Sequence, residues 1–171
     1  MFSKKIKAPL SESQALDKLA QLCSASEHCR QEMVEKCRGW GLPPDACQRV
    51  ADTLVRERFV DDGRYAPIFV RDKARFSGWG PAKVRMQLLS KGVDEDLADD
   101  AIEAFDKDEW NDILIRALRS KLRSARQPDG EADLTYGSKL FASLVRFALS
   151  RGFSYEQARH AIEAIVSGSE A

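Results

Sequence analysis

A short pattern recurs three times in this sequence, and it limits the possible folds more than any other feature. The copies read GLPPDACQRVADTL from Gly41, GVDEDLADDAIEAF from Gly92 and GFSYEQARHAIEAI from Gly152. Each copy begins with a glycine and an apolar residue, which is typical of a helix end, and continues with small or apolar residues at helical spacing. A basic amphipathic segment precedes each copy. The pattern therefore predicts a repeated unit that contains two helices joined by a tight turn.

Helical periodicity extends over nearly the whole chain, and no long stretch alternates apolar and polar residues. The spacing between copies leaves room for a third helix in each unit. A unit of about 50 residues buries little apolar surface alone, so neighbouring units are expected to support one another. We predict an all-α protein with three tandem three-helix repeats in an elongated, curved, right-handed array.

Local punctuation gives the expected boundaries. Ser154 with Gln157 predicts a capping box, Pro81 suits a first helical turn, and Gly92 and Gly152 suit left-handed helix ends. The predicted organisation is a flexible N-terminal tail at 1–10, a leading helix at 11–25, a first three-helix repeat at 26–77, a second at 78–126, a loop at 127–135 and a third repeat of two helices at 136–168.

The charge of the chain is balanced but unevenly distributed. The formal net charge is +0, so the total indicates no particular partner. Residues 94–109 carry nine acids and one base, whereas residues 116–126 carry five bases and no acid. Such blocks create local fields that the total conceals.

Cysteine usage and hydropathy indicate a cytoplasmic protein. Cys23, Cys29, Cys37 and Cys47 match none of the usual zinc spacings, so we expect reduced thiols, no metal and no cofactor, and their roles stay open. The sequence MFSKKIKAPLSES has no apolar core typical of a signal peptide, and no run approaches the roughly 20 apolar residues of a membrane span.

The segment from Val55 to Asp96 resembles the central signature of the RecX family of recombinase regulators. The matching residues are Phe59-Val60, Asp61-Asp62, Tyr65-Ala66, Arg71 to Arg75, Gly78-Trp79-Gly80-Pro81, Lys83 with Arg85, and Lys91-Gly92. The turn from Arg151 to Ser154 also fits the last repeat of the family. Two positions depart from the family pattern, since Arg58 stands where glycine is usual and Gln87 where glutamate is usual.

The resemblance implies both a fold and a function. The family fold is three tandem three-helix repeats. The implied activity is binding of the RecA recombinase, often in its filament on single-stranded DNA, and inhibition of filament growth, strand exchange and ATP hydrolysis. This role belongs to DNA repair, DNA recombination and the SOS response. We expect a monomer that binds RecA and its nucleoprotein filament, while a weak contact with single-stranded or duplex DNA stays open.

Basic residues on three expected helices are candidates for partner binding. On the expected helix 108–125, arginines lie opposite an apolar face that includes Trp110. A stripe of this kind can meet an acidic protein surface or a row of phosphates, although many such stripes only face solvent. The candidates are Arg116, Arg119, Arg123 and Arg126 on this helix, Arg71, Lys73 and Arg75 on the expected helix 61–76, and Lys83 and Arg85 on the expected helix 81–91.

Aromatic residues should mark the core and the junctions between repeats. We expect Phe76 to be buried with the other apolar residues of helix 61–76, and Trp110 to lie in the core. Trp40 and Trp79, which lie in turns, should wedge between repeats or else face a partner. The segment Gly78-Trp79-Gly80-Pro81 lacks the longer glycine loop that holds phosphates, so we do not expect a phosphate site there. Its glycines should end one helix and Pro81 should begin the next, so the segment is expected to form the hinge between the first and second repeats.

The sequence favours two other functions less. A direct DNA-binding protein of helix-turn-helix type is conceivable, because three-helix units resemble such domains. Catalysis is disfavoured, because the chain has only two histidines, His28 and His160, and none of the common motifs for nucleophilic, metal or phosphate chemistry. The sequence does not decide which face binds a partner or the sign of the regulation.

Overall fold

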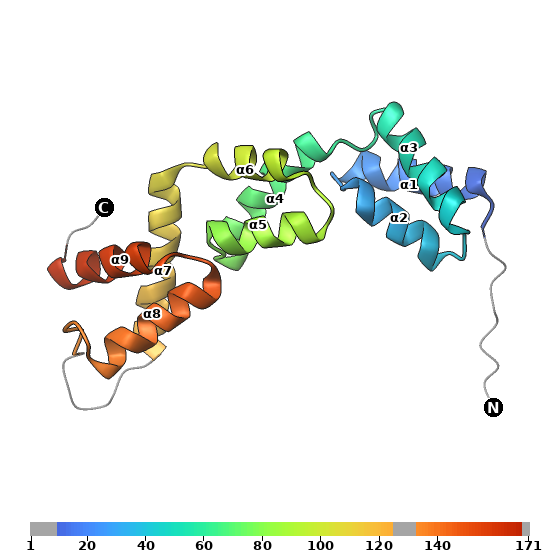
Figure 1. Cartoon of the computed structure of the whole chain (residues 1–171). Helices are drawn as coiled ribbons and strands as arrows, with labels where there is room; N and C mark the ends of the chain where they lie inside the picture. The colour runs from blue at the N-terminus through green and yellow to red at the C-terminus, as the bar shows by residue number, and fades with distance from the viewer. Residues whose placement is uncertain (1–9, 125–132, 169–171) are drawn as a thin grey trace, which may run out of the picture.

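The computed structural model describes residues 10–124 and 133–168, and within these ranges the chain is all-α, as predicted. Its nine helices follow one another along an elongated molecule (Figure 1). They are α1 (Glu12–Ala25), α2 (Arg30–Gly39), α3 (Pro44–Arg56), α4 (Asp62–Ser77), α5 (Pro81–Ser90), α6 (Glu95–Glu103), α7 (Lys107–Ser124), α8 (Lys139–Arg151) and α9 (Tyr155–Ser167). The handedness of the array stays a prediction.

The helices pack in threes, with boundaries that differ from the expected ones. Helices α1 to α3 form unit 1, α4 to α6 form unit 2, and α7 to α9 form unit 3. The expected repeats at 26–77 and 78–126 assigned α4 and α7 to the preceding unit. The repeated turn joins the second and third helices of each unit. The helix that the repeated pattern does not contain is therefore the first helix of the unit, and it precedes the pattern in the sequence.

The predicted signals at the helix ends are confirmed. Ser154 and Gln157 form a capping box at the start of α9, and Pro81 is the first residue of α5. Gly92 and Gly152 adopt left-handed conformations with φ of 73° and 91°. The expected tail at 1–10 and loop at 127–135 fall mostly outside the described residues.

Buried side chains form two separate clusters. One lies within unit 1 and includes Val60, which follows α3. The other runs through units 2 and 3 together and also takes in Cys29, from the turn between α1 and α2. Trp110 is 5% exposed in this shared core, as expected, whereas Phe76 is 85% exposed, so its predicted burial is wrong. Units 2 and 3 therefore form one body with a continuous core.

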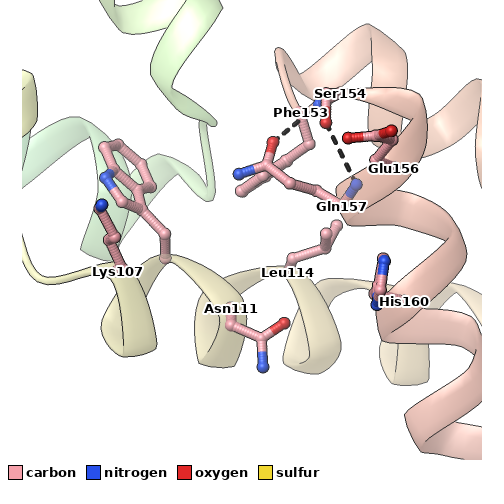
Figure 2. A pocket seen from close by; sticks show the side chains of 9 residues that line it. Lys107, Asn111, Leu114, Phe153, Ser154, Glu156, Gln157 and His160 are labelled. Carbon is pink, nitrogen blue, oxygen red and sulfur yellow. Dashed lines mark hydrogen bonds between the residues drawn. The ribbon is translucent and has the colours of Figure 1, made fainter.

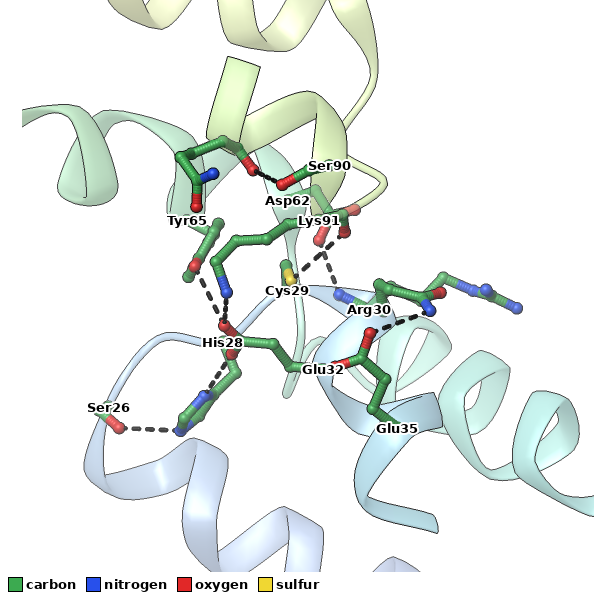
Figure 3. Close-up of polar contacts among 12 residues, drawn as sticks. Ser26, His28, Cys29, Arg30, Glu32, Glu35, Asp62, Tyr65, Ser90 and Lys91 are labelled. Carbon is green, nitrogen blue, oxygen red and sulfur yellow. Dashed lines mark hydrogen bonds and ion pairs between the residues drawn. The ribbon is translucent and has the colours of Figure 1, made fainter. Parts of the chain in front are cut away.

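Polar contacts dominate the junction between units 1 and 2. The carboxylate of Glu32, on α2, accepts hydrogen bonds from Lys91 Nζ at 2.6 Å, Tyr65 Oη at 3.2 Å and His28 Nδ1 at 2.8 Å (Figure 3). Asp62, on α4, accepts from the backbone N–H of Arg30 at 2.9 Å and so satisfies the first turn of α2. Lys91 and Tyr65 belong to unit 2, so Glu32 ties the two bodies together.

The segment Gly78-Trp79-Gly80-Pro81 joins α4 to α5 inside unit 2, and is not the hinge between the first two units. The Gly80 N–H donates to Arg151 O at 2.7 Å, and the Ala82 N–H donates to Gly152 O at 3.1 Å. The Arg151 guanidinium donates to Ser77 O at 2.7 Å. This turn therefore binds backbone to backbone against the α8–α9 turn of unit 3, and we call this contact the seam.

Arg58, in the turn that follows α3, carries backbone strain. It is the one non-glycine residue with positive φ in the described ranges, at 61°. Arg58→Gly is expected to raise the free energy of unfolding by about 1 kcal/mol, because glycine adopts this conformation without the Cβ penalty. The greater flexibility of glycine in the unfolded chain cancels only part of this gain. Urea denaturation followed by circular dichroism measures the change.

Arg56→Gly is the matched control for this prediction, because Arg56 is also exposed but lies in the last turn of α3. It should lower stability by up to about 1 kcal/mol. Equal losses in both variants would show that the strain at Arg58 costs nothing.

Candidate partner-binding surface

Three of the predicted arginines form an exposed face on α7. Arg116 and Arg123 are exposed and Arg119 is half-buried, and their helical spacing places them on one side. The opposite sides of α7 are buried by Trp110, Ile113, Leu114, Ile115 and Leu118. In the described ranges none of the three arginines forms an ion pair with a carboxylate. We call Arg116, Arg119 and Arg123 the arginine face; Arg126 lies outside the described residues.

Arg75 meets the same side of α7 but is neutralised there. Its guanidinium holds Glu109 through two hydrogen bonds, of 2.5 and 3.0 Å. The hydrogen bonds from Arg75, aided by the field of Arg116, hold the pKa of Glu109 below its ordinary value. Glu109 precedes Arg116 by two helical turns, so this ion pair marks the end of the arginine face. Arg71, one turn before Arg75, pairs with Asp72 at 3.2 Å.

Lys73 and Lys83 converge on Trp79. Their ammonium groups lie 5.2 and 4.8 Å from the centroid of the Trp79 ring, which is within the range of cation–π attraction. Trp79 is half-buried and packs against the core that units 2 and 3 share. Trp40 packs on the core of unit 1 beneath Lys18, so it does not wedge between units as expected.

Arg85 serves the inside of unit 2. Its guanidinium donates to Asp99, on α6, at 2.5 and 2.9 Å, and it also pairs with Glu95. These hydrogen bonds raise the pKa of Arg85 and lower that of Asp99. The nine predicted residues thus do not make one surface. Arg75 and Arg85 join helices, and Arg71 pairs with its neighbour Asp72. The other described ones, Lys73, Lys83, Arg116, Arg119 and Arg123, form no ion pair with a carboxylate in the described ranges.

Two further cations went unnoticed in the sequence. Lys121 Nζ and the Arg151 guanidinium lie 5.9 and 5.0 Å from the ring centroid of Phe147, on α8. Arg151 belongs to the turn that fits the last repeat of the family, but the sequence did not identify it as a candidate for partner binding. Its contact with Phe147 joins side chains one helical turn apart, and this spacing alone does not indicate a binding surface. Both cations lie on unit 3, and Arg151 also takes part in the seam.

A shallow hollow between α7 and the start of α9 offers no catalytic arrangement (Figure 2). Its walls include Lys107, Phe153 and His160. Two of its polar side chains are already used in the capping box: Ser154 Oγ accepts from the Gln157 N–H, and Gln157 Oε1 accepts from the Ser154 N–H. No group of three or more histidine, cysteine, aspartate or glutamate residues in the described ranges could hold a metal ion.

None of the described helices is both long enough and apolar enough to cross a bilayer. The fold and the surface together define a class: an all-α protein of tandem three-helix units with an exposed arginine face. Residues 61–102, which cover unit 2, match the family model described as "RecX, second three-helix domain". This boundary agrees with the packing of α4 with α5 and α6.

Similar proteins extend the match over most of the chain. The regulatory protein RecX of Chromohalobacter salexigens is 30% identical over 151 residues, which cover 88% of this chain and 92% of that protein. The regulatory protein RecX of Xanthomonas campestris pv. campestris is 32% identical, over 74% of this chain and 72% of that protein. The chain therefore belongs to the RecX family of regulatory proteins, which are not enzymes.

A solved structure supports the fold independently. The crystal structure of RecX from Lactobacillus salivarius superimposes with a TM-score of 0.72 at 20% sequence identity, covering 91% of this chain and 97% of that chain. The three-unit architecture is therefore conserved where most side chains differ.

Proposed function

We propose that this chain binds the RecA recombinase, or its filament on single-stranded DNA, and inhibits filament extension, ATP hydrolysis and strand exchange. The arginine face is the observation that carries the proposal. Two of its arginines are exposed and one is half-buried, and within the described residues none has a carboxylate partner, on a chain of the RecX family. Arginines without a carboxylate partner attract an acidic protein surface or phosphates. The proposed place of action is the cytoplasm, in DNA repair and the SOS response.

The elongated shape suits a partner that is itself a repeating assembly. Units 1 and 3 lie at opposite ends of the molecule (Figure 1), so separate units can contact successive protomers. Linked contacts raise the overall affinity without a new type of contact. A monomer that bridges protomers in this way would hold the filament in one state or block the next subunit.

Direct DNA binding is the second candidate, since the arginine face could also follow a phosphate row. The acidic helix α6 and the zero net charge disfavour it. A titration with DNA alone across salt concentrations separates the two functions. Tight binding without recombinase, with a steep dependence on salt, would support direct DNA binding.

The ATPase rate of recombinase on single-stranded DNA tests the proposal. The wild type should inhibit it, and a variant with Arg116→Ala, Arg119→Ala and Arg123→Ala should need at least about tenfold more protein for half-inhibition, because each lost charge contact weakens binding. The control removes three exposed arginines from unit 1: Arg38→Ala, Arg49→Ala and Arg56→Ala. Because Arg49 pairs with Glu12 on α1, circular dichroism must confirm that this variant is folded. Equal inhibition by both folded variants would remove the arginine face from the interface.

A further inference from the structure

Three large apolar side chains are exposed close together in the sequence of unit 2. Phe76 is 85% exposed at the end of α4, and Met86 and Leu89 are 60% and 36% exposed on α5. On α5, Val84 and Leu88 fill the core from the opposite side. Helix α5 therefore has apolar side chains on both its inner and its outer side. The core of unit 2 accounts for the inner ones, whereas the outer ones face solvent.

Two lysines and Trp79 link the parts of α4 and α5 that carry these side chains. Lys73 lies one turn before Phe76 on α4, and its ammonium group reaches the ring of Trp79. Lys83 reaches the same ring, and Met86 lies one turn after Lys83. We call this set the anchor surface; it consists of Lys73, Phe76, Trp79, Lys83, Met86 and Leu89.

The two lysines of the anchor surface, Lys73 and Lys83, have no carboxylate partner in the described ranges, and the neighbouring Asp72 is paired with Arg71. Both ammonium groups rest on the face of an aromatic ring. Lys83 Nζ also donates to Ser150 O at 3.4 Å. An ammonium group has three donors, so each lysine can still donate to a carboxylate that approaches from outside. The surface thus combines apolar anchors with free cations, as protein interfaces often do.

We propose that the anchor surface is a docking site for a partner protein that presents an apolar socket edged with carboxylates. The inference rests on the proposed function, in which that partner is a recombinase protomer. Phe76 would enter the socket, Met86 and Leu89 would extend the apolar contact, and Lys73 and Lys83 would meet the carboxylates. On α4, Lys73 and Arg75 point about 160° apart, so this site is separate from the arginine face.

A protein fits this surface better than a nucleic acid does. Stacking of bases needs an open ring face, and the cations already cover the ring of Trp79. Met86 and Leu89 offer nothing to phosphates.

A second copy of this chain fits poorly as well. In a two-fold symmetric dimer the same patch meets itself. The lysines of one anchor surface would then face those of the other, and like charges would oppose the contact. The free cations instead select a partner of opposite charge.

The test compares a double variant, Phe76→Ser with Met86→Ser, with a matched control, Val55→Ser with Val166→Ser. The control side chains are 41% and 61% exposed in units 1 and 3, so both variants trade exposed apolar groups for hydroxyls. Dissociation constants are measured for recombinase alone and for a single-stranded oligonucleotide alone, and sedimentation velocity reports self-association. Circular dichroism confirms that each variant is folded.

The double variant should bind recombinase at least tenfold more weakly than the wild type, while the control binds normally and oligonucleotide binding is unchanged. Unchanged recombinase binding by the double variant would overturn the inference and leave the proposed function intact. A selective loss of oligonucleotide binding, or of a wild-type dimer, would assign the surface to that occupant instead. A wild type that binds no recombinase would refute the proposed function, and the inference with it.

A second variant tests the charges. Lys73→Gln with Lys83→Gln should weaken recombinase binding and make it less dependent on salt, because two charge pairs are lost. Weaker binding with an unchanged salt dependence would contradict the role of the carboxylates.

Discussion

Gly152→Ala is expected to lower the free energy of unfolding by about 2–5 kcal/mol, the largest loss that we foresee for a single methyl group. Gly152 has a φ of 91°, where an alanine side chain is strained. Its added Cβ would also lie 2.5 Å from Lys83 N and closer still to Lys83 Cβ. Backbone atoms on both sides of the seam would have to move apart.

The matched control for this prediction is Gly137→Ala. Gly137 has a similar φ of 88°, but a Cβ there would meet nothing within 4 Å. It should therefore show the backbone strain alone, about 1–2 kcal/mol. Urea denaturation of both variants gives the difference; equal losses would show that the seam has room for the methyl group and is not closely packed.

The second large effect is expected at Glu32. Partial burial favours the neutral acid, but the hydrogen bonds from Lys91 and His28 outweigh it and hold the pKa of Glu32 below its ordinary value of 4.5. The ionised carboxylate therefore stabilises the junction between units 1 and 2. Glu32→Gln should lower the free energy of unfolding at neutral pH by about 1–2 kcal/mol, a value reduced by solvent that reaches the half-buried pair.

The same shift predicts the pH dependence. Because the folded-state pKa is lowered, the stabilisation is fully present above pH 4.5, the ordinary value, and is lost as pH falls through the lower folded-state value. The stability difference between wild type and Glu32→Gln should shrink from about pH 7 to about pH 3. Glu35→Gln, an exposed change on the same helix, is the control for the loss of one carboxylate from α2. A difference that stays constant with pH would contradict the assigned role of Glu32.

Local signals made part of the fold predictable from the sequence. The left-handed glycines and the capping box depend on neighbours within a few residues, so their sequence pattern was sufficient. The grouping of helices was different, because the repeated pattern holds two helices and does not say from which side the third one packs.

Phe76 shows why the core could not be predicted in full. A stripe through Tyr65 and Phe69 continues to Phe76 on an ideal wheel. In the structure the buried side of α4 moves from Tyr65 and Phe69 toward Val70 and Ala74. Phe76 then points away from the core, and the anchor surface follows from this rotation.

Ion pairs between helices also lie outside what spacing can show. Arg75 finds Glu109 at a separation of 34 residues, and Arg85 finds Asp99 at a separation of 14. The sequence identified both arginines as basic groups on helix surfaces. Only the packing shows that the carboxylates of other helices neutralise them.

The central claim is that the arginine face lets this chain restrain a recombinase filament. Filament extension on single-stranded DNA, followed in time by light scattering or electron microscopy, tests it most directly. The wild type should halt extension, whereas a folded variant with Arg116→Glu, Arg119→Glu and Arg123→Glu should let filaments grow as they do without added protein. A variant that halts extension at the same concentration as the wild type would contradict the claim.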